Sequence, residues 1–162
     1  MLYALLSAPF AAALIVSFGS GRDPHACSRT GMLLSLLIAA LGLPLITCMP
    51  NLSVTHDWFT LWGTGASVHF SLSADGLSAW LIQLVTFLTP VAILASKDLA
   101  VERMREFVAT VLVMEGLMIA ALLAADLVLF YVSFEAMLIP MLILICLFGG
   151  KDRRRAALHF LL

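Results

Sequence analysis

The sequence predicts an all-α membrane protein, a polytopic bundle of transmembrane helices in a single domain covering residues 1–162. The chain is 62% hydrophobic, whereas soluble domains are roughly 45–50% apolar. Its mean hydropathy is +1.08 and only 12% of its residues are charged. The apolar residues form long runs without the alternation that strands of a membrane barrel require. A net charge of −1 gives no reason to expect a nucleic-acid partner.

Five apolar runs are long enough, or nearly so, to cross a bilayer as helices, at about 20 residues per span. The first run has no basic residue before it, unlike a secretory signal, so we expect it to remain in the membrane. A sixth run begins at residue 156 and covers only seven residues. The predicted spans are residues 2–18, 31–48, 77–95, 107–125 and 127–148, with a partial span at 156–162.

The partial span has a length of about 10 Å as a helix, roughly a third of the hydrocarbon thickness. A carboxyl terminus at that depth would be costly. We therefore expect this chain to be an N-terminal portion, and the remaining helices to come from a C-terminal half or from a second chain. A natural split and a truncation are both compatible with this expectation.

The basic residues predict the orientation. All nine Lys and Arg residues follow the first, third and fifth spans, and none follows the second or fourth. If the chain alternates sides, the three basic loops share one side. The positive-inside rule places that side in the cytoplasm or the mitochondrial matrix. The N-terminus then faces the periplasm or the intermembrane space.

The segment between the second and third spans carries Trp58 and Trp62, and Trp80 follows at the start of the third span. Indole rings prefer the headgroup level, where the ring is half-buried and its N–H stays hydrated. We interpret these residues as an aromatic belt with a short segment on the outer surface. Binding of a substrate by the rings is the alternative.

Two carboxylates fall inside predicted spans, Glu115 and Glu135. A charged group in hydrocarbon is costly and marks ion or proton pathways. Each acid lies ten residues from Ala125, near the predicted turn, so both should lie roughly 15 Å from it. Two acids at one depth in a low dielectric are not both expected to be ionised. They predict a proton relay or a cation site, and the alternative is a hydrogen bond that only secures packing.

Other polar positions are weaker candidates. Pro140 cannot donate to the carbonyl of Ala136, so we expect a kink or a loosened turn there. His159, in the partial span, has a side chain suited to proton transfer, although it is equally compatible with an interface role. The three cysteines form neither a CxxC motif nor a Cys/His cluster, so no metal site or disulfide is expected.

Three stretches resemble a known family. The sequences DLVLFYVSFEAMLIPMLILICLFGGKDRRRAALHF, SLSADGLSAWLIQLVTFLTPVAILAS and EGLMIAALLAADLVLFYV are similar to subunit 4 of proton-pumping NADH:quinone oxidoreductase, complex I. This subunit belongs to the antiporter-like proteins related to Mrp cation/proton antiporters. The matching positions include Phe130, Tyr131, Glu135, Leu138, Ile139, Pro140, Met141, the segment Asp75 to Ser78, and Leu88, Thr89 and Pro90.

The resemblance implies a role in proton translocation, with Glu135 in the proton path and Glu115 at a second acidic position. In the family the glutamate pairs with a lysine on a later helix, beyond this chain. His159 stands where the family often has a lysine. The resemblance also implies partners among the other membrane-arm subunits, a mitochondrial inner or bacterial plasma membrane, and no flavin, iron–sulfur cluster or quinone on this chain. The alternatives are an Mrp antiporter or membrane-bound hydrogenase subunit, or a non-transporting structural module.

Overall fold

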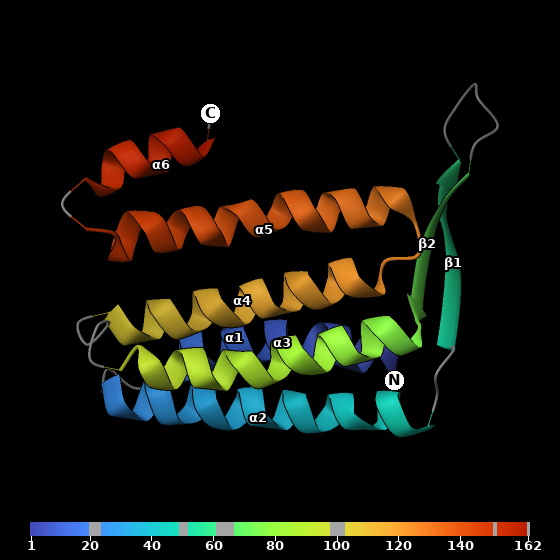
Figure 1. Ribbon diagram of the computed structural model, residues 1–162, viewed down its shortest axis with the longest axis horizontal. Coiled ribbons are helices and arrows are strands. Elements are labelled where there is room, and N and C mark those ends of the chain that lie inside the picture. Colours follow the sequence, from blue (N-terminus) through green and yellow to red (C-terminus); the bar gives the residue numbers. More distant parts are fainter. Residues whose placement is uncertain (20–23, 49–51, 61–66, 98–102, 151, 162) are drawn as a thin grey trace.

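The computed structural model describes residues 1–19, 24–48, 52–60, 67–97, 103–150 and 152–161. Long helices run side by side and a β-hairpin stands across one end of them (Figure 1). In chain order the elements are α1 (Leu2–Gly19), α2 (Pro24–Cys48), β1 (Leu52–Thr60), β2 (Ser67–Ala74), α3 (Gly76–Ala95), α4 (Met104–Leu123), α5 (Leu127–Phe148) and α6 (Arg153–Leu161).

The helices α1 to α5 each have the length and apolar composition needed to cross a membrane, which confirms the five predicted spans. Several boundaries differ from the prediction. Helix α2 begins at Pro24 rather than residue 31, α4 covers Met104–Leu123 rather than 107–125, and α6 covers Arg153–Leu161 rather than 156–162. Proline is favoured in the first helical turn, and arginine can extend its charged end into water while its stem covers apolar surface. The helical structure therefore extends past the apolar run.

The hairpin is the main feature that the sequence did not predict. Strands β1 and β2 pair antiparallel from Leu52↔Ala74 to Thr60↔Ser67, with an irregularity between Asp57 and Phe59. Its β-branched and aromatic residues favour an extended, paired conformation, although the segment was expected only to lie on the outer surface.

Trp80 is the tryptophan whose exposure the structure describes. It is the fifth residue of α3, the helix that begins directly after β2, and it is 64% exposed. The aromatic belt stays a prediction. Trp58 lies in β1, and Trp62 lies outside the described residues.

The hairpin is connected to the turn between α4 and α5. The backbone N–H of Ala125 donates to the carbonyl of Ser71 at 2.9 Å, and Leu72 forms an isolated bridge with Ala124. Asp126 then caps α5, because its Oδ1 accepts from the N–H of Val128 at 2.7 Å. The turn thus has backbone partners from β2 and a side-chain cap of its own.

Helix α3 has a capping box at its outer end. Asp75 Oδ1 accepts from the N–H of Ser78 at 2.7 Å, and Ser78 Oγ accepts from the N–H of Asp75 at 2.9 Å. Hydrogen bonds from the side chain and then the backbone of Ser78 hold the pKa of Asp75 below its ordinary value of 3.8. The cap therefore stabilises the fold fully at pH values above the ordinary pKa of the carboxyl group. This stabilisation is lost as the pH falls through the lowered pKa.

Helix α4 lies at the centre of the bundle and contacts α1, α2, α3 and α5. Its buried positions recur every three or four residues, as expected for one face of a helix. Glycines allow close approach on two sides: a Cβ at Gly31 of α2 would overlap Val108, and one at Gly116 would lie 2.9 Å from the ring of Phe10. The residues of α4 that form this pattern are Val108, Leu112, Glu115, Ile119 and Leu123.

Helix α5 has far less cover. Only 11% of its most apolar window is buried, compared with 33–44% for the other four spans. It packs on α4 along one side, while α6 turns back alongside it (Figure 1). Most of an apolar helix surface is therefore left for lipid or for further protein.

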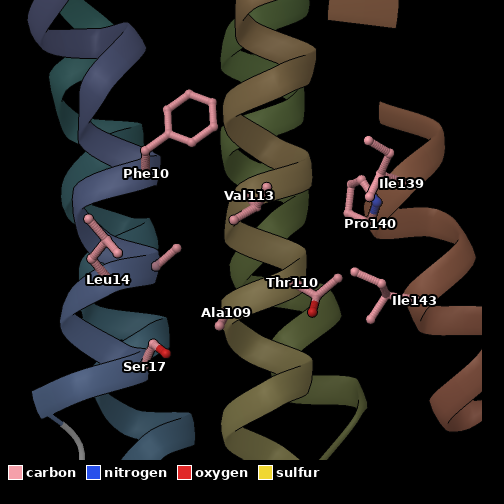
Figure 2. Close-up of a pocket in the computed structure, with 10 residues that line it drawn as sticks. Phe10, Leu14, Ser17, Ala109, Thr110, Val113, Ile139, Pro140 and Ile143 are labelled. Carbon is pink, nitrogen blue, oxygen red and sulfur yellow. The ribbon is translucent and has the colours of Figure 1, made fainter. Parts of the chain in front are cut away.

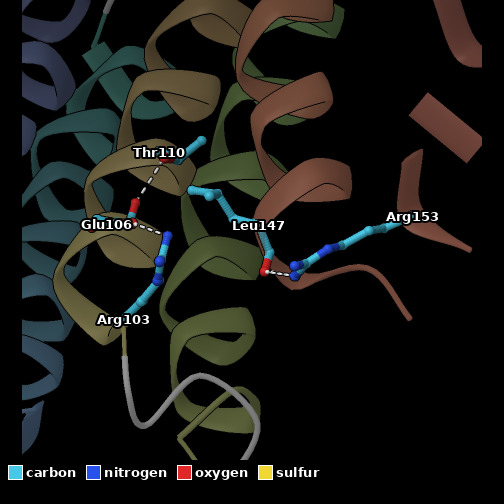
Figure 3. Close-up of polar contacts among 5 residues, drawn as sticks. All are labelled: Arg103, Glu106, Thr110, Leu147 and Arg153. Carbon is cyan, nitrogen blue, oxygen red and sulfur yellow. Dashed lines mark hydrogen bonds and ion pairs between the residues drawn. The ribbon is translucent and has the colours of Figure 1, made fainter. Parts of the chain in front are cut away.

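The described basic side chains gather at the end opposite the hairpin. There Arg103 pairs with Glu106 at 3.6 Å, and Arg153 Nη1 donates to the carbonyl of Leu147 at 3.5 Å (Figure 3). Thr110 Oγ1 donates to the carbonyl of Glu106 at 2.7 Å. Both arginines are exposed and their contacts contribute little to stability. Both arginines lie at the same end of the bundle, as the prediction that the basic loops share one side requires. Which side of the membrane this end faces stays a prediction.

The contact between Gly31 and Val108 gives a test of the packing. We expect Gly31→Ala to lower the free energy of unfolding by about 1–3 kcal/mol, because an added methyl group overpacks a close helix contact. Thermal unfolding in detergent or nanodiscs would measure this change. Gly76→Ala is the control, since a Cβ there meets nothing within 4 Å. Val108→Ala should restore part of the stability in the double variant, and an unaltered midpoint in Gly31→Ala would contradict the packing.

Candidate functional site

The α4–α5 hairpin sets the depth of both acids. Glu115 is the eighth residue before Leu123, the last of α4, and Glu135 is the eighth after Leu127, the first of α5. At 1.5 Å per residue, each lies about 12 Å along its helix from the turn. The prediction that both acids lie at the same depth is therefore consistent with the lengths of α4 and α5.

The side chain of Glu115 is enclosed. It is 1% exposed and lines a cavity of about 120 Å³ between α3 and α4. Thr89 of α3 lies close to the carboxyl group, but its hydroxyl donates to the carbonyl of Val85 at 3.1 Å. Within the described residues, neither Oε1 nor Oε2 of Glu115 has a hydrogen-bond partner.

Glu135 has a different environment. It is exposed on α5 and lines a cavity of about 500 Å³ that Phe160 of α6 borders from the other side. Tyr131, one turn earlier on the same helix, places its hydroxyl within interaction range of the Glu135 carboxylate. The remaining lining residues, all of α5, are Ala136, Leu138, Ile139 and Leu142.

The two acids therefore belong to separate sites. The cavity at Glu115 is formed by α3 and α4, the cavity at Glu135 by α5 and α6, and no residue lines both. A cation held between the two carboxylates, one of the sequence-based possibilities, has no support in this arrangement. The two acids lie at equal depth because they are equally far from the turn between α4 and α5. The direction in which each side chain faces depends instead on which helices pack against its own helix.

Pro140 lies on the side of α5 that faces the bundle. It is buried and borders an apolar cavity of about 420 Å³ between α1, α4 and α5, opposite Phe10 and Leu14 of α1 (Figure 2). Helix α5 is continuous across it from Leu127 to Phe148. The carbonyl of Ala136 still lacks its usual donor, because proline has no N–H. A kink at this position stays a prediction.

His159 does not join either acid in this structure. It lies in the last turn of α6 and is exposed, and it lines neither acid's cavity. Its neighbour Phe160 takes the position beside Glu135 instead. A proton-transfer role for His159 stays an untested prediction.

Sequence reasoning did not single out Phe160 or Thr89 as parts of these sites. Thr89 was noted only within a Leu-Thr-Pro motif, although a hydroxyl in an apolar helix is a signal for a polar neighbour. Phe160 gave no signal, because one phenylalanine among many apolar residues is unremarkable. Among the described residues, no group of three or more His, Cys, Asp or Glu side chains is placed to hold a metal ion.

Comparison with known proteins places this arrangement in a wider context. The chain is 38% identical over 162 residues to NADH-quinone oxidoreductase subunit M of Rhodobacter capsulatus, covering 95% of this chain. It is 40% identical over 90 residues to NADH-ubiquinone oxidoreductase chain 4 of Mycosarcoma maydis, covering 55% of this chain. The chain is homologous to subunit M and chain 4 of these oxidoreductases. The resemblance found in the sequence is thereby confirmed, although no family model matches the chain.

The fold of this subunit M homologue agrees with solved structures. A chain of respiratory complex I from Thermus thermophilus matches with a TM-score of 0.78 and 30% identity, over 99% of this chain and 32% of that one. A chain of the Mrp complex from Dietzia sp. DQ12-45-1b matches with a TM-score of 0.76 over 97% of this chain and 17% of that one. At 20% identity, this match shows a shared fold alone.

The subunit M homologue is short compared with these relatives. It spans about a third of the Rhodobacter protein, 31% of its length, and 19% of the Mycosarcoma protein. The activity and partners of a full-length subunit are therefore a matter of proposal for this chain.

The orphaned carboxyl group of Glu115 gives a prediction about stability. We expect Glu115→Met to keep the free energy of unfolding within about 1 kcal/mol or to raise it, because a buried acid without protein partners is costly and an apolar group of similar size is not. Chemical unfolding in detergent would measure the change. Leu112→Ala, at a fully buried neighbour on α4, should cost about 2–5 kcal/mol and shows that the assay is sensitive. A loss of similar size in Glu115→Met would mean that the acid serves packing.

Proposed function

We propose that this chain is a membrane-arm segment of respiratory complex I and contributes to proton translocation coupled to NADH:quinone oxidoreduction. The observation that carries the proposal is the position of Glu135. Its carboxylate projects from the uncovered side of a 22-residue apolar helix into a cavity of about 500 Å³. The homology to subunit M and chain 4 supports the same function.

Glu135 is suited to hold and release a proton if a cation approaches it. Two unit charges 4 Å apart interact by about 4 kcal/mol at an effective dielectric constant of about 20. Such an attraction stabilises the charged carboxylate, so the approach of a cation would favour release of the proton. Withdrawal of the cation would favour its return. In the proposal, the lysine implied by the family resemblance supplies this charge from the remaining part of the subunit.

The surroundings of Glu135 support a proton-holding role. Tyr131 places a hydroxyl near the carboxylate, so one polar neighbour on α5 can orient it. The other side chains that line its cavity are apolar and include Leu138, Ile139 and Phe160. The carboxylate thus combines a local orienting group with a largely apolar wall.

Redox chemistry is assigned to other subunits in this proposal. The chain would receive energy through conformational and electrostatic coupling from subunits that oxidise NADH. Its partners are further membrane-arm subunits, the lipid bilayer, and the C-terminal half or second chain that covers α5. The membrane is the mitochondrial inner membrane, with a bacterial plasma membrane as the alternative, since relatives of both origins match.

The fold match to the Mrp complex supports one alternative. A subunit of a cation/proton antiporter or a membrane-bound hydrogenase would use the same bundle and the same acid. Purification distinguishes these cases, because the preferred proposal requires NADH-oxidising subunits to copurify with the chain. The other alternative is a structural module whose acids only secure packing.

Substitution of Glu135 tests the proposal. We expect Glu135→Gln to reduce proton translocation by about tenfold or more, equivalent to about 1.4 kcal/mol, while the complex still assembles. The amide keeps the size of the side chain but cannot carry the proton. Dye-monitored acidification in vesicles that contain the whole complex would measure translocation, and native electrophoresis would measure assembly.

Glu106→Gln is the matched control for this substitution. Glu106 belongs to the same α4–α5 hairpin but lies at its basic end, 48% exposed and paired with Arg103. We expect its replacement to leave translocation unaltered. Normal translocation in Glu135→Gln would refute the proton-carrying role, and failed assembly in Glu135→Gln alone would favour the structural module.

A further inference from the structure

A second site lies between α3 and α4, and its acid is buried. Glu115 is the largest polar side chain among the fully buried residues, and both of its carboxylate oxygens lack a described protein partner. A buried acid without partners is unfavourable unless water or a proton satisfies it. The helix therefore retains a costly group at this position.

The carboxyl group faces a cavity between α3 and α4. The cavity volume is about 120 Å³, well above the roughly 10–15 Å³ that one ordered water molecule needs. Its apolar walls include Leu88 and Ala92 of α3 and Met114 and Met118 of α4. An enclosed apolar cavity stays dry. This cavity is partly open and has Glu115 as a polar group in its wall.

Thr89 is the second polar group. Its hydroxyl donates to the carbonyl of Val85 at 3.1 Å, so the lone pairs on Oγ1 remain available to accept a hydrogen bond. Thr89 also lines the same cavity as Glu115. A water molecule between them can donate to Thr89 Oγ1 and exchange a hydrogen bond with the Glu115 carboxyl group. That arrangement gives the water the two or more partners it requires.

We propose that the cavity between α3 and α4 is a hydrated proton-binding site, in which Glu115 holds the proton and Thr89 positions the water. The O–H bond of the protonated carboxyl group breaks as the proton passes to the water, leaving a carboxylate and a hydronium ion, and the reverse step restores the acid. This inference extends the proposed proton-transfer function to a second site that shares no lining residue with Glu135.

A metal cation suits the cavity less well. Hard cations take about six or more oxygen ligands, whereas the side chains around this cavity offer one carboxylate and one hydroxyl. Apolar side chains and thioethers form the rest of the wall. Water needs fewer partners and carries the proton itself, so the chemistry of the lining favours a hydrated acid.

Infrared spectroscopy of the native subunit within its assembled complex tests the proposal. A carboxylic-acid band that disappears in Glu115→Gln would belong to Glu115. We expect this band to shift within minutes of transfer to D₂O, because cavity water exchanges the acid proton. Absence of such a band would overturn the proposal, and so would a band that stays unshifted for hours.

Two variants test the cavity and the hydroxyl separately. Ala92→Leu fills the cavity without removing a polar group, and we expect it to slow deuterium exchange at Glu115 tenfold or more. Ala95→Leu, on the same helix but outside the lining, should leave exchange unaltered. Thr89→Val should also slow exchange and Thr89→Ser should restore it, while Thr86→Val serves as the control. Unaltered exchange in both Ala92→Leu and Thr89→Val would overturn the site.

This experiment also separates the two proposals. The Glu115 band should remain the same in Glu135→Gln, because the two acids line different cavities. Normal pumping in Glu135→Gln together with the expected exchange at Glu115 would refute only the proposed role of Glu135. Loss of pumping in Glu135→Gln with a dry, slowly exchanging Glu115 would refute only the hydrated site.

Discussion

The arrangement depends on the short, anchored turn between α4 and α5. In hydrocarbon every backbone polar group needs a partner within the protein, so a turn must either reach water or find partners. Here Ser71 accepts from Ala125, and Asp126 caps the next helix. These contacts fix where each helix begins and ends. Because the rise per residue is constant, they also fix how far each acid lies from the turn.

The bundle gives two acids at similar depth opposite surroundings. Glu115 belongs to the central helix, where packing on several sides excludes the other acid and encloses the carboxyl group. Glu135 belongs to a helix that contacts the bundle along one side, so its carboxylate remains open to a later partner. Low dielectric makes both groups sensitive to any nearby charge or proton donor. Position within the packing, rather than depth, decides what each acid can interact with.

The sequence predicted the helical class and the five spans well, because long apolar runs are a strong signal, and it located two acids inside those spans. It did not predict the β-hairpin, since its polar and apolar residues are also compatible with a surface segment. It gave no facing direction for Glu115, because the burial of that side chain depends on how α3 packs against α4. Nor did it predict Phe160 beside Glu135, since that contact requires α6 to turn back along α5. Such relations depend on tertiary packing.

The link between β2 and the α4–α5 turn has a consequence for the lipid environment. A turn whose backbone groups already have protein partners does not have to be drawn up to bulk water to be satisfied. The contact with Ser71 thus gives the N–H of Ala125 a partner that does not depend on where the headgroup region begins.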